Sequence, residues 1–372
     1  MTDYEIEMEL DDALLAFPNE KPVNLSYWNS GSEYKARLKK ILRYETEQEV
    51  FDYEYYFPES SNREIARKFG FSDKDFENLL FAPIAQSTLC IASLVVLLSK
   101  RQLKLGMVAP VYFSVQSCCD DLKVPYTLFD DFIEDINGTF DADRLLESDC
   151  DAFWFTSPVN AASIYFNDKV KGGIQRLLDA GKLVVLDESL CVNGMELSRT
   201  FGIQENLIYI YSPHKTLGIQ GIKFSTIVVH QKNYDEIDSL EDCYGSALNY
   251  SCQQGVVHFI SENFDECIAF YNAYWRENLE VVRRVLGRYD FAHVSPNVYG
   301  HYAMVFIDRL VEDRGFVDAM KKLMKEQGYF IYPGVMQGFD SDRHFCFRVN
   351  MLLDKKDLEQ GLGVVLDYLR GL

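Results

Sequence analysis

The sequence has no CxxC pair and no long apolar run, and it has fewer positive than negative charges. Its nine cysteines are scattered singly, apart from the adjacent Cys118 and Cys119, which indicates neither a zinc site nor a disulfide framework. We therefore expect reduced thiols in the cytoplasm and no metal. The longest apolar segment, 89–98, is too short to span a bilayer, and the acidic start MTDYEIEMELDDALLAF has the pattern of neither a signal nor a transit peptide.

The charge balance limits the classes of partner. Lysine and arginine number 37 against 57 aspartates and glutamates, which gives a net charge of -20. This argues against nucleic acid or an anionic membrane as the main partner, since both attract basic surfaces. The 48% hydrophobic and 25% charged residues are typical of a soluble globular protein. Any phosphate or carboxylate site must then be a local group of donors.

The middle of the chain alternates short apolar runs with amphipathic or apolar helical segments. This alternation predicts an α/β fold with a mostly parallel sheet that has helices on both faces. From about Asn263 a long helical pattern and then two strand-like runs predict a smaller α+β part, to which the N-terminal segment is expected to contribute. The expected strands are LKLGMVAP, YTLFD, CDAFWFTSP, KLVVLDES, NLIYIYS and FSTIVVH, and the helices between them include STLCIASLVVLLSK and VKGGIQRLLDAG.

The carboxyl ends of the expected strands contain most of the polar candidates, and ligands bind at these ends in such sheets. They offer an aromatic ring, an amide, a carboxylate, a lysine and several hydroxyl groups near a helix start. This set suits a flat, phosphorylated, nitrogen-containing ring with an aldehyde, and the absence of GxGxxG and GxxxxGK[ST] argues against a dinucleotide. The ends are 81–88, 109–113, 156–163, 186–189 and 212–215.

The stretch YSPHKTLGIQGIKFS fits the pattern S-x-[SH]-K-x-x-G-x-x-G-x-[RK] through Ser212, His214, Lys215, Gly218, Gly221 and Lys223. From about Pro22 to the C-terminus the chain resembles the pyridoxal phosphate (PLP) enzymes of fold type I, in the class I/II aminotransferase group. The resemblance implies that Lys215 forms a Schiff base with PLP and shuttles a proton, as a lysine of lowered pKa can. It also implies that Ser212 and Lys223 hold the phosphate.

The resemblance assigns roles to the other strand ends. Asp187 would pair with the pyridine nitrogen of PLP, and Tyr112 would stack on its ring. Asn160 would bond the ring hydroxyl and lie against the substrate. Ala85 and Gln86 would offer backbone amides to the phosphate at a helix N-terminus.

Two further residues are implied on the substrate side. Arg348 would clamp the substrate α-carboxylate by two parallel hydrogen bonds, and Trp28 lies near the substrate loop of the family. The family also places a tyrosine that reaches the phosphate of a neighbouring subunit, for which Tyr53, Tyr55 and Tyr56 compete. A homodimer, with an amino acid as substrate, is therefore expected.

The chain departs from the family in two places. Leu190 stands where a tyrosine would bond the ring hydroxyl, and the motif around Asn160 lacks its second proline and its glycine. A histidine at the position of His214 also occurs in fold type I decarboxylases and desulfurases, where it serves near the ring or only packs. These departures suggest a specialised member of the group.

Three functions remain open: an aminotransferase, a fold type I enzyme of specialised metabolism that performs elimination, cyclisation or decarboxylation, and a non-catalytic PLP-binding module. The third is disfavoured because the lysine is retained and no basic helix-turn-helix segment precedes the domain. The resemblance implies an N-terminal arm with part of the small domain at 1–50, a large PLP-binding domain at 51–265 and a small domain at 266–372.

Overall fold

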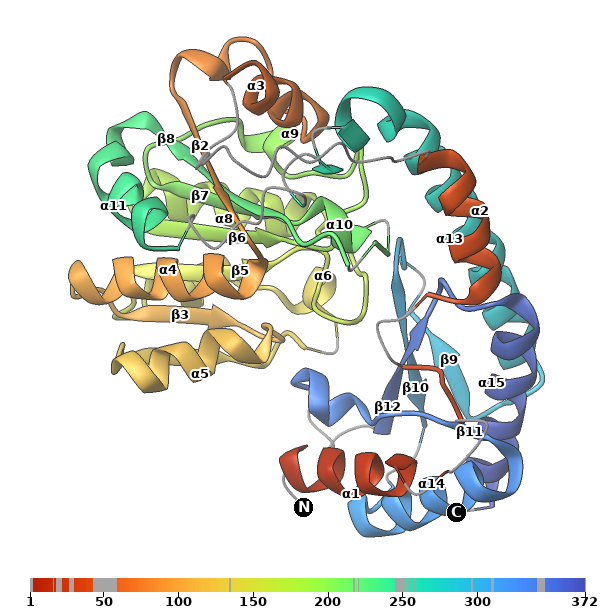
Figure 1. The fold of residues 1–372 in the computed structure, drawn as a ribbon. Helices are drawn as coiled ribbons and strands as arrows, with labels where there is room; N and C mark the ends of the chain where they lie inside the picture. Colours follow the sequence, from red (N-terminus) through yellow and green to blue (C-terminus); the bar gives the residue numbers. More distant parts are fainter. Residues whose placement is uncertain are drawn as a thin grey trace. The chain divides into compact units, whose positions relative to one another are not determined.

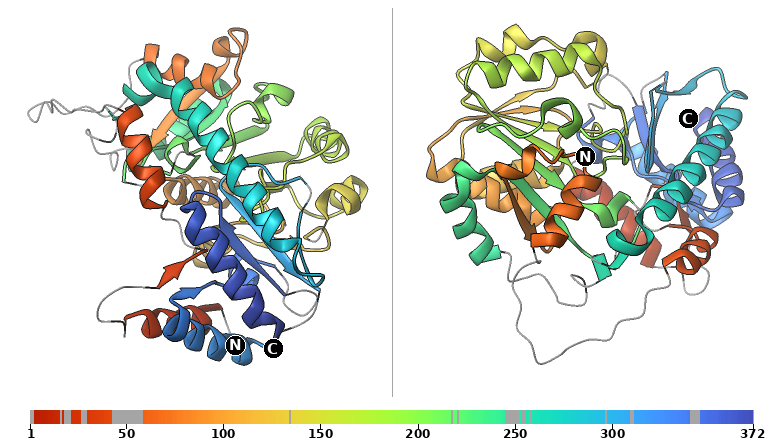
Figure 2. Two further views of the ribbon diagram at one scale, coloured as in Figure 1. Left: turned by 90° about the vertical axis from the view of Figure 1, so that its right-hand side faces the viewer. Right: turned by 90° about the horizontal axis from the view of Figure 1, so that it is seen from above.

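The computed structural model divides the chain into two compact units (Figures 1 and 2). Unit 1 comprises Met1–Arg37, Ala161–Ile164 and Asn272–Leu372, and unit 2 comprises Leu38–Asn160 and Tyr165–Tyr271. The structure describes residues 3–15, 17, 22–26, 30–42, 59–133, 135–216, 218–219, 221–244, 252, 255–256, 258–295, 297–308, 311–339 and 345–371.

Unit 2 is built on a seven-stranded sheet with the order β2-β8-β7-β6-β5-β3-β4. Strand β8 is antiparallel to its neighbours β2 and β7, and the other pairs are parallel. The strands are β2 (Leu79–Ile84), β3 (Leu105–Val108), β4 (Tyr126–Phe129), β5 (Ala152–Thr156), β6 (Leu183–Glu188), β7 (Leu207–Tyr211) and β8 (Ser225–His230). The predicted α/β fold with a mostly parallel sheet is confirmed.

Helices cover both faces of this sheet. Helices α4 (Ser87–Lys100), α5 (Phe113–Leu122) and α11 (Tyr234–Tyr244) share one apolar cluster with one face, and α8 (Asp168–Asp179) packs on β6. The other helices among the described residues of this unit are α3 (Glu59–Lys68), η1 (Asp75–Glu77), α6 (Ile136–Thr139), α7 (Ala142–Leu146), α9 (Ser198–Phe201), α10 (Pro213–Thr216), η2 (Gln231–Asn233) and η4 (Phe259–Asn263).

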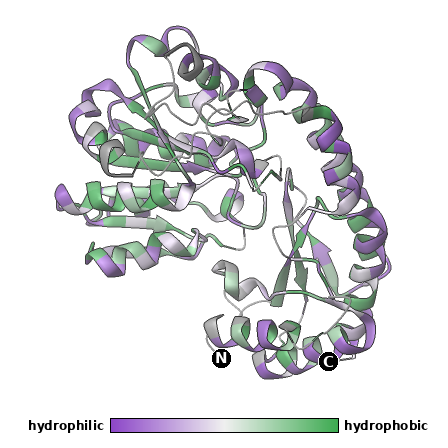
Figure 3. Cartoon of the chain, in the orientation of Figure 1, coloured by the Kyte–Doolittle hydropathy of each residue, from purple (hydrophilic) through white to green (hydrophobic). Residues whose placement is uncertain are grey.

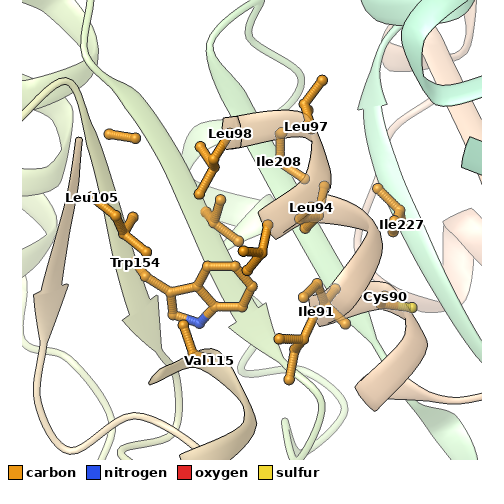
Figure 4. Packing of buried hydrophobic residues seen from close by; sticks show 14 of the residues in the cluster. Cys90, Ile91, Leu94, Leu97, Leu98, Leu105, Val115, Trp154, Ile208 and Ile227 are labelled. Carbon is orange, nitrogen blue, oxygen red and sulfur yellow. The ribbon is translucent and has the colours of Figure 1, made fainter. Parts of the chain in front are cut away.

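The apolar cluster explains why α4 has little polar surface. Its side chains Ile91, Leu94 and Leu98 are buried against strand residues such as Trp154, which Figure 4 shows among them. Figure 3 shows most of α4 as hydrophobic, as expected of a helix with little exposed face. The strands read as continuous apolar runs because both faces of the sheet are covered.

Unit 1 is an α+β unit with a three-stranded antiparallel sheet of order β12-β10-β9 and a parallel pair, β1 with β11. Arg284 and Glu359 form an ion pair between α13 and α15, which run side by side (Figure 2). The elements are α1 (Asp3–Leu15), β1 (Val23–Asn24), α2 (Ser32–Leu42), α13 (Phe264–Leu286), β9 (Ala292–Val294), β10 (Tyr302–Ile307), α14 (Asp313–Gln327), β11 (Tyr329–Phe330), η5 (Gly334–Gln337), β12 (Phe345–Asn350) and α15 (Lys355–Arg370). Helices α2 and α13 each cross a unit boundary in the chain.

The boundaries of the units differ from those expected from the sequence. They fall after Arg37 and Tyr271 rather than near residues 50 and 265, and a short insertion, Ala161–Ile164, belongs to unit 1. In the described part of the chain, no helix is both long and apolar enough to cross a membrane.

A buried carboxyl group, Glu188, ends β6 beside the buried rings of Tyr209 and Tyr211. Its two oxygens accept hydrogen bonds from the hydroxyl of Tyr211 (2.8 Å) and the backbone N–H of Leu197 (2.9 Å). Burial nevertheless raises the pKa of Glu188 to about 8, because desolvation of the charged form outweighs the two hydrogen bonds. The carboxyl group is therefore mostly protonated at neutral pH.

This burial predicts a pH dependence of stability. The folded chain holds the Glu188 proton up to about pH 8, whereas the unfolded chain releases it near pH 4. The group therefore stabilises the fold at acidic pH and loses this contribution as the pH rises from about 5 to 8, by about 1.4 kcal/mol per pH unit. Urea unfolding at several pH values should show this slope in the wild type and a weaker slope in Glu188→Gln.

A matched control is Glu77→Gln, which changes an exposed glutamate of the same unit. This control should retain the wild-type slope. Equal slopes in the wild type and Glu188→Gln would show that Glu188 is already ionised in the folded chain at neutral pH.

Candidate active site

Lys215 lies on the short helix α10, directly beyond the carboxyl end of β7 (Figure 1). Its Nζ donates a hydrogen bond to Oγ of Ser87 (2.6 Å), the first residue of α4, and lies 5.6 Å from the ring centroid of Tyr112. Three connections, β2–α4, β3–α5 and β7–α10, therefore meet at this amine.

The surroundings of Lys215 favour the neutral amine. Burial lowers the pKa of Lys215, while the negative charge of Asp187 and the nearby Cys90 act in the opposite direction. The neutral amine is the form that can attack a carbonyl carbon or accept a proton. A larger share of Lys215 is neutral at a given pH than of an exposed lysine.

Asp187 lies near the end of β6 and is only 3% exposed. Its Oδ1 accepts hydrogen bonds from the backbone N–H (3.1 Å) and the hydroxyl (2.5 Å) of Ser189. Burial raises the pKa of Asp187, and the charge of Lys215 and the two bonds from Ser189 oppose this rise. Lys215 and Asp187 are thus close enough to influence each other's charge.

Hydroxyl groups gather at the same edge of the sheet. Oγ of Ser212, which follows β7, lies 2.7 Å from Oγ of Ser225, the first residue of β8. Strand register explains the contact, because Tyr211 is paired with Thr226 and Ser225 with Ile84, the last residue of β2. Both serine side chains are buried.

The N-terminus of α4 follows the end of β2 through Ala85 and Gln86, both partly exposed. Gln86 is the N-cap residue, and its side chain makes no capping hydrogen bond. The first N–H groups of a helix have no partner within the helix and are well placed to receive an anion. Together with Ser87, Ser212 and Ser225 they form a set of neutral donors suited to a phosphate group.

The candidates for the ring face come from two loops. Tyr112 is the N-cap residue of α5 and is half-buried. Asn160 is 7% exposed, and its Nδ2 donates to the carbonyl of Val111 (3.4 Å), next to Tyr112. The loop after β5 is thereby tied to the loop after β3.

His214 and Lys223 have different surroundings. Nδ1 of His214 lies 2.5 Å from the carbonyl oxygen of Phe224 and 3.2 Å from its backbone nitrogen, so the imidazole lies against the backbone of Phe224. Burial and the charges of Lys215 and Lys223 lower the pKa of His214 to about 3, and the ring is neutral at pH 7. Lys223 is exposed, and Leu190 is half-buried.

Arg348 belongs to unit 1, on β12, and is 6% exposed. Its Nε and Nη2 both donate to the carbonyl oxygen of Ser26, at 3.0 and 2.6 Å, and the guanidinium lies 4.3 Å from the ring centroid of Tyr302. The side chain is thus held in one orientation. Trp28, Tyr53, Tyr55 and Tyr56 lie outside the described residues.

Three polar residues of this edge were not predicted from the sequence: Ser87, Ser189 and Ser225. Ser87 and Ser189 stand within the strand-end segments, one residue after Gln86 and two after Asp187, so a search for hydroxyl donors beside those two residues would have found them. Ser225 begins a strand instead of ending one. Within the described ranges, no group of three or more histidine, cysteine or acidic side chains is arranged to hold a metal ion.

Comparisons with known proteins identify the fold of the chain. No protein-family model and no curated protein sequence matches the chain. Solved structures do match: the PLP-dependent cyclase OrfR (15% identity, TM-score 0.77, covering 97% of this chain and 96% of that one) and an aminotransferase from Mycobacterium tuberculosis (15%, 0.77, 100% and 96%). A PLP-bound C-S lyase from Staphylococcus hominis is also similar (14% identity, TM-score 0.69, covering 95% and 90%).

Identities of this size establish the fold alone. The predicted resemblance to fold type I is confirmed at that level, since the matches cover nearly the whole of both chains. The chain therefore has the fold shared by these PLP-dependent enzymes, with a large mostly parallel sheet and a smaller α+β unit.

Proposed function

We propose that this protein is a PLP-dependent enzyme that acts on an amino acid, most simply an aminotransferase. The carrying observation is the amine of Lys215, partly buried at the carboxyl edge of the sheet, 2.6 Å from Ser87 Oγ and influenced by the charge of Asp187. A lowered lysine pKa in such a place is typical of a catalytic amine.

The residues of unit 2 fit PLP. Lys215 would hold its aldehyde carbon covalently, and Asp187 would face the pyridine nitrogen, where the negative charge of a carboxylate would keep that nitrogen protonated. Tyr112 would cover one face of the ring. Asn160 would bond the ring hydroxyl.

The phosphate of PLP would be held by neutral donors and one cation. Ser212 and the backbone amides at Ala85 and Gln86 would donate to it, with Ser225 and Ser87 beside them. Lys223 would contribute a point charge, since a lysine lacks the bidentate fork of arginine. Unit 2 is thereby proposed as the PLP-binding domain, and unit 1 as the small domain.

When bound, PLP supplies an electron sink for a carbanion at the substrate α-carbon. Lys215 would take the proton from that carbon with its neutral Nζ and return it elsewhere, which its lowered pKa favours. Asp187 would keep the ring nitrogen protonated while this transfer takes place. Ser87 would accept the Nζ hydrogen bond and fix the direction of the amine.

Arg348 is the residue proposed to bind the substrate carboxylate, and Trp28 and Asn160 are proposed as further substrate contacts. Two of the guanidinium nitrogens of Arg348 are anchored on Ser26, and Tyr302 supports its face, so the group is pre-oriented. A fixed guanidinium suits bidentate recognition of an α-carboxylate. An amino acid is therefore the proposed substrate.

Transamination is favoured over elimination, cyclisation or decarboxylation because most of the similar structures are described as aminotransferases, including enzymes from Thermotoga maritima and Leishmania infantum. The two kinds of reaction share Lys215, Asp187 and Arg348. They differ in whether the amine form of the cofactor accumulates when one amino acid is supplied alone. We place the enzyme in biosynthetic amino acid metabolism of the cytoplasm.

The first prediction from this proposed function concerns cofactor attachment. Protein supplied with PLP should turn yellow, and borohydride reduction should fix the cofactor on Lys215, as peptide mass analysis would show. The rate of attachment should rise with pH with a midpoint below the value of an ordinary lysine, about 10.4, because burial lowers the pKa of Lys215. Lys215→Ala should lose turnover and labelling while its fold is retained.

The control for attachment is Lys182→Ala, which removes a partly exposed lysine bonded to the carbonyl of Cys150. This variant should be labelled on Lys215 like the wild type. A colourless wild type that stays unlabelled in excess PLP would contradict the proposed function.

The second prediction separates Asp187 from Arg348. Asp187→Asn is nearly isosteric but cannot hold a full charge on the ring nitrogen, so kcat should fall by several orders of magnitude, about 4 kcal/mol or more. Arg348→Lys keeps the charge but loses the fork. It should mainly raise KM for the amino acid, by about 2–3 kcal/mol of binding free energy. Steady-state kinetics would distinguish the two failures.

The control for the arginine is Arg370→Lys, which changes another arginine of unit 1 that lies over a tyrosine ring, 4.8 Å from the centroid of Tyr289. Its KM should equal that of the wild type. If KM is also unchanged in Arg348→Lys, the carboxylate is bound elsewhere.

The third prediction is a homodimer. Large apolar side chains such as Phe113, 61% exposed beside Tyr112, and Leu128, 38% exposed on the edge strand β4, support an apolar contact of this chain. An obligate dimer buries roughly 2,000 Å² or more. Light scattering should give twice the chain mass of 43.0 kDa at the enzyme concentration of the activity assay. A fully active monomer would refute the dimer.

A further inference from the structure

We propose that Ser189 is a positioning residue that fixes and charges Asp187 for its contact with the pyridine nitrogen. The proposal rests on the proposed function and extends it to a residue outside the predicted set. Ser189 stands two residues after Asp187, at the turn that follows β6, and is 6% exposed.

The two hydrogen bonds from Ser189 reach only one of the two carboxylate oxygens of Asp187. Both its backbone N–H (3.1 Å) and its hydroxyl (2.5 Å) donate to the same oxygen, Oδ1 of Asp187. Two donors on one oxygen fix the rotation of the carboxylate about its last bond. Oδ2 is then the oxygen assigned to the ring nitrogen.

The same bonds support the charge of Asp187. The carboxyl group is 3% exposed, and charge in such a place is unfavourable unless donors or a cation compensate. Lys215 is one such cation, but its charge changes whenever its amine takes or gives up a proton. Ser189 donates in every protonation state of Lys215, so its support is constant.

A purely structural role is the alternative reading. An N–H bond to an aspartate two residues earlier also forms in ordinary Asx turns. The hydroxyl bond is not needed for such a turn. The replacement Ser189→Ala therefore removes the charge-supporting hydroxyl and keeps the backbone N–H that closes the turn, and Ser189→Thr restores a hydroxyl.

The experiment measures PLP affinity of the apoprotein against pH, by absorbance titration, in the wild type, Ser189→Ala and Ser189→Thr. Affinity should fall on acidification as Asp187 takes up a proton. In Ser189→Ala this fall should begin at higher pH, by about one pH unit, because one hydrogen bond to the charged form is lost. Ser189→Thr should return toward the wild-type profile.

A matched control is Ser198→Ala, which removes another buried hydroxyl of unit 2, bonded to the carbonyl of Phe69. Its PLP affinity should fall over the same acidic pH range as that of the wild type, although its thermal unfolding midpoint is lower. Thermal melting shows whether Ser189→Ala still folds. If it does not, Ser189→Thr is compared with the wild type instead. A wild-type dependence of its PLP affinity on pH supports the proposal, and an affinity that is weakened equally at every pH overturns it.

The remaining outcomes separate the two proposals. If the wild type binds PLP and the affinity of Ser189→Ala falls over the same pH range, Ser189 does not support the charge of Asp187, and only this inference is overturned. If the wild type binds no PLP at any pH, the proposed function is overturned and the inference falls with it.

Discussion

The charges of Lys215 and Asp187 depend on each other, and the rest of the site is arranged around them. Asp187 is buried and Lys215 is partly buried, which raises the pKa of the carboxyl group and lowers that of the amine, while each charge opposes the shift of its neighbour. The fold provides the place for such a pair, because consecutive strands of a parallel sheet deliver their loops to one edge. The two residues are far apart in the sequence, and the pairing of β6 with β7 in the sheet brings them together.

How far the sequence predicts this site depends on strand direction. Residues at or just beyond the carboxyl ends of parallel strands, such as Asp187 and Lys215, are identified by searching strand ends. Ser225 escapes that search because β8 is antiparallel, and its first residue therefore lies at the edge where its neighbours end. Apolar runs predict the strands but neither their order nor the direction of β8, which are set by packing over the whole sheet.

The loop after Asn160 shows why a degraded motif can still form the local structure. Ser163 stands where the family has glycine and adopts a φ of 53°, a left-handed conformation that costs a residue with a side chain some free energy. Its hydroxyl accepts the N–H of Tyr302 and its carbonyl accepts the N–H of Tyr299, so hydrogen bonds within unit 1 compensate for the strain. The role of Asn160 itself stays a prediction, as does that of the exposed Lys223.

The acidic composition and the proposed phosphate site are compatible for a related reason. With a net charge of -20, long-range attraction of an anion is weak, and binding must come from short contacts. The hydroxyl groups of Ser212 and Ser225 and the first amides of α4 are neutral groups, and in the proposed phosphate site they would bind an anion without requiring a positive surface. Because such contacts are buried and short, salt screens them less than it screens surface charges. In the proposed site, neutral donors with the single cation Lys223 would thus hold a phosphate that an arginine-rich pocket holds in a basic protein.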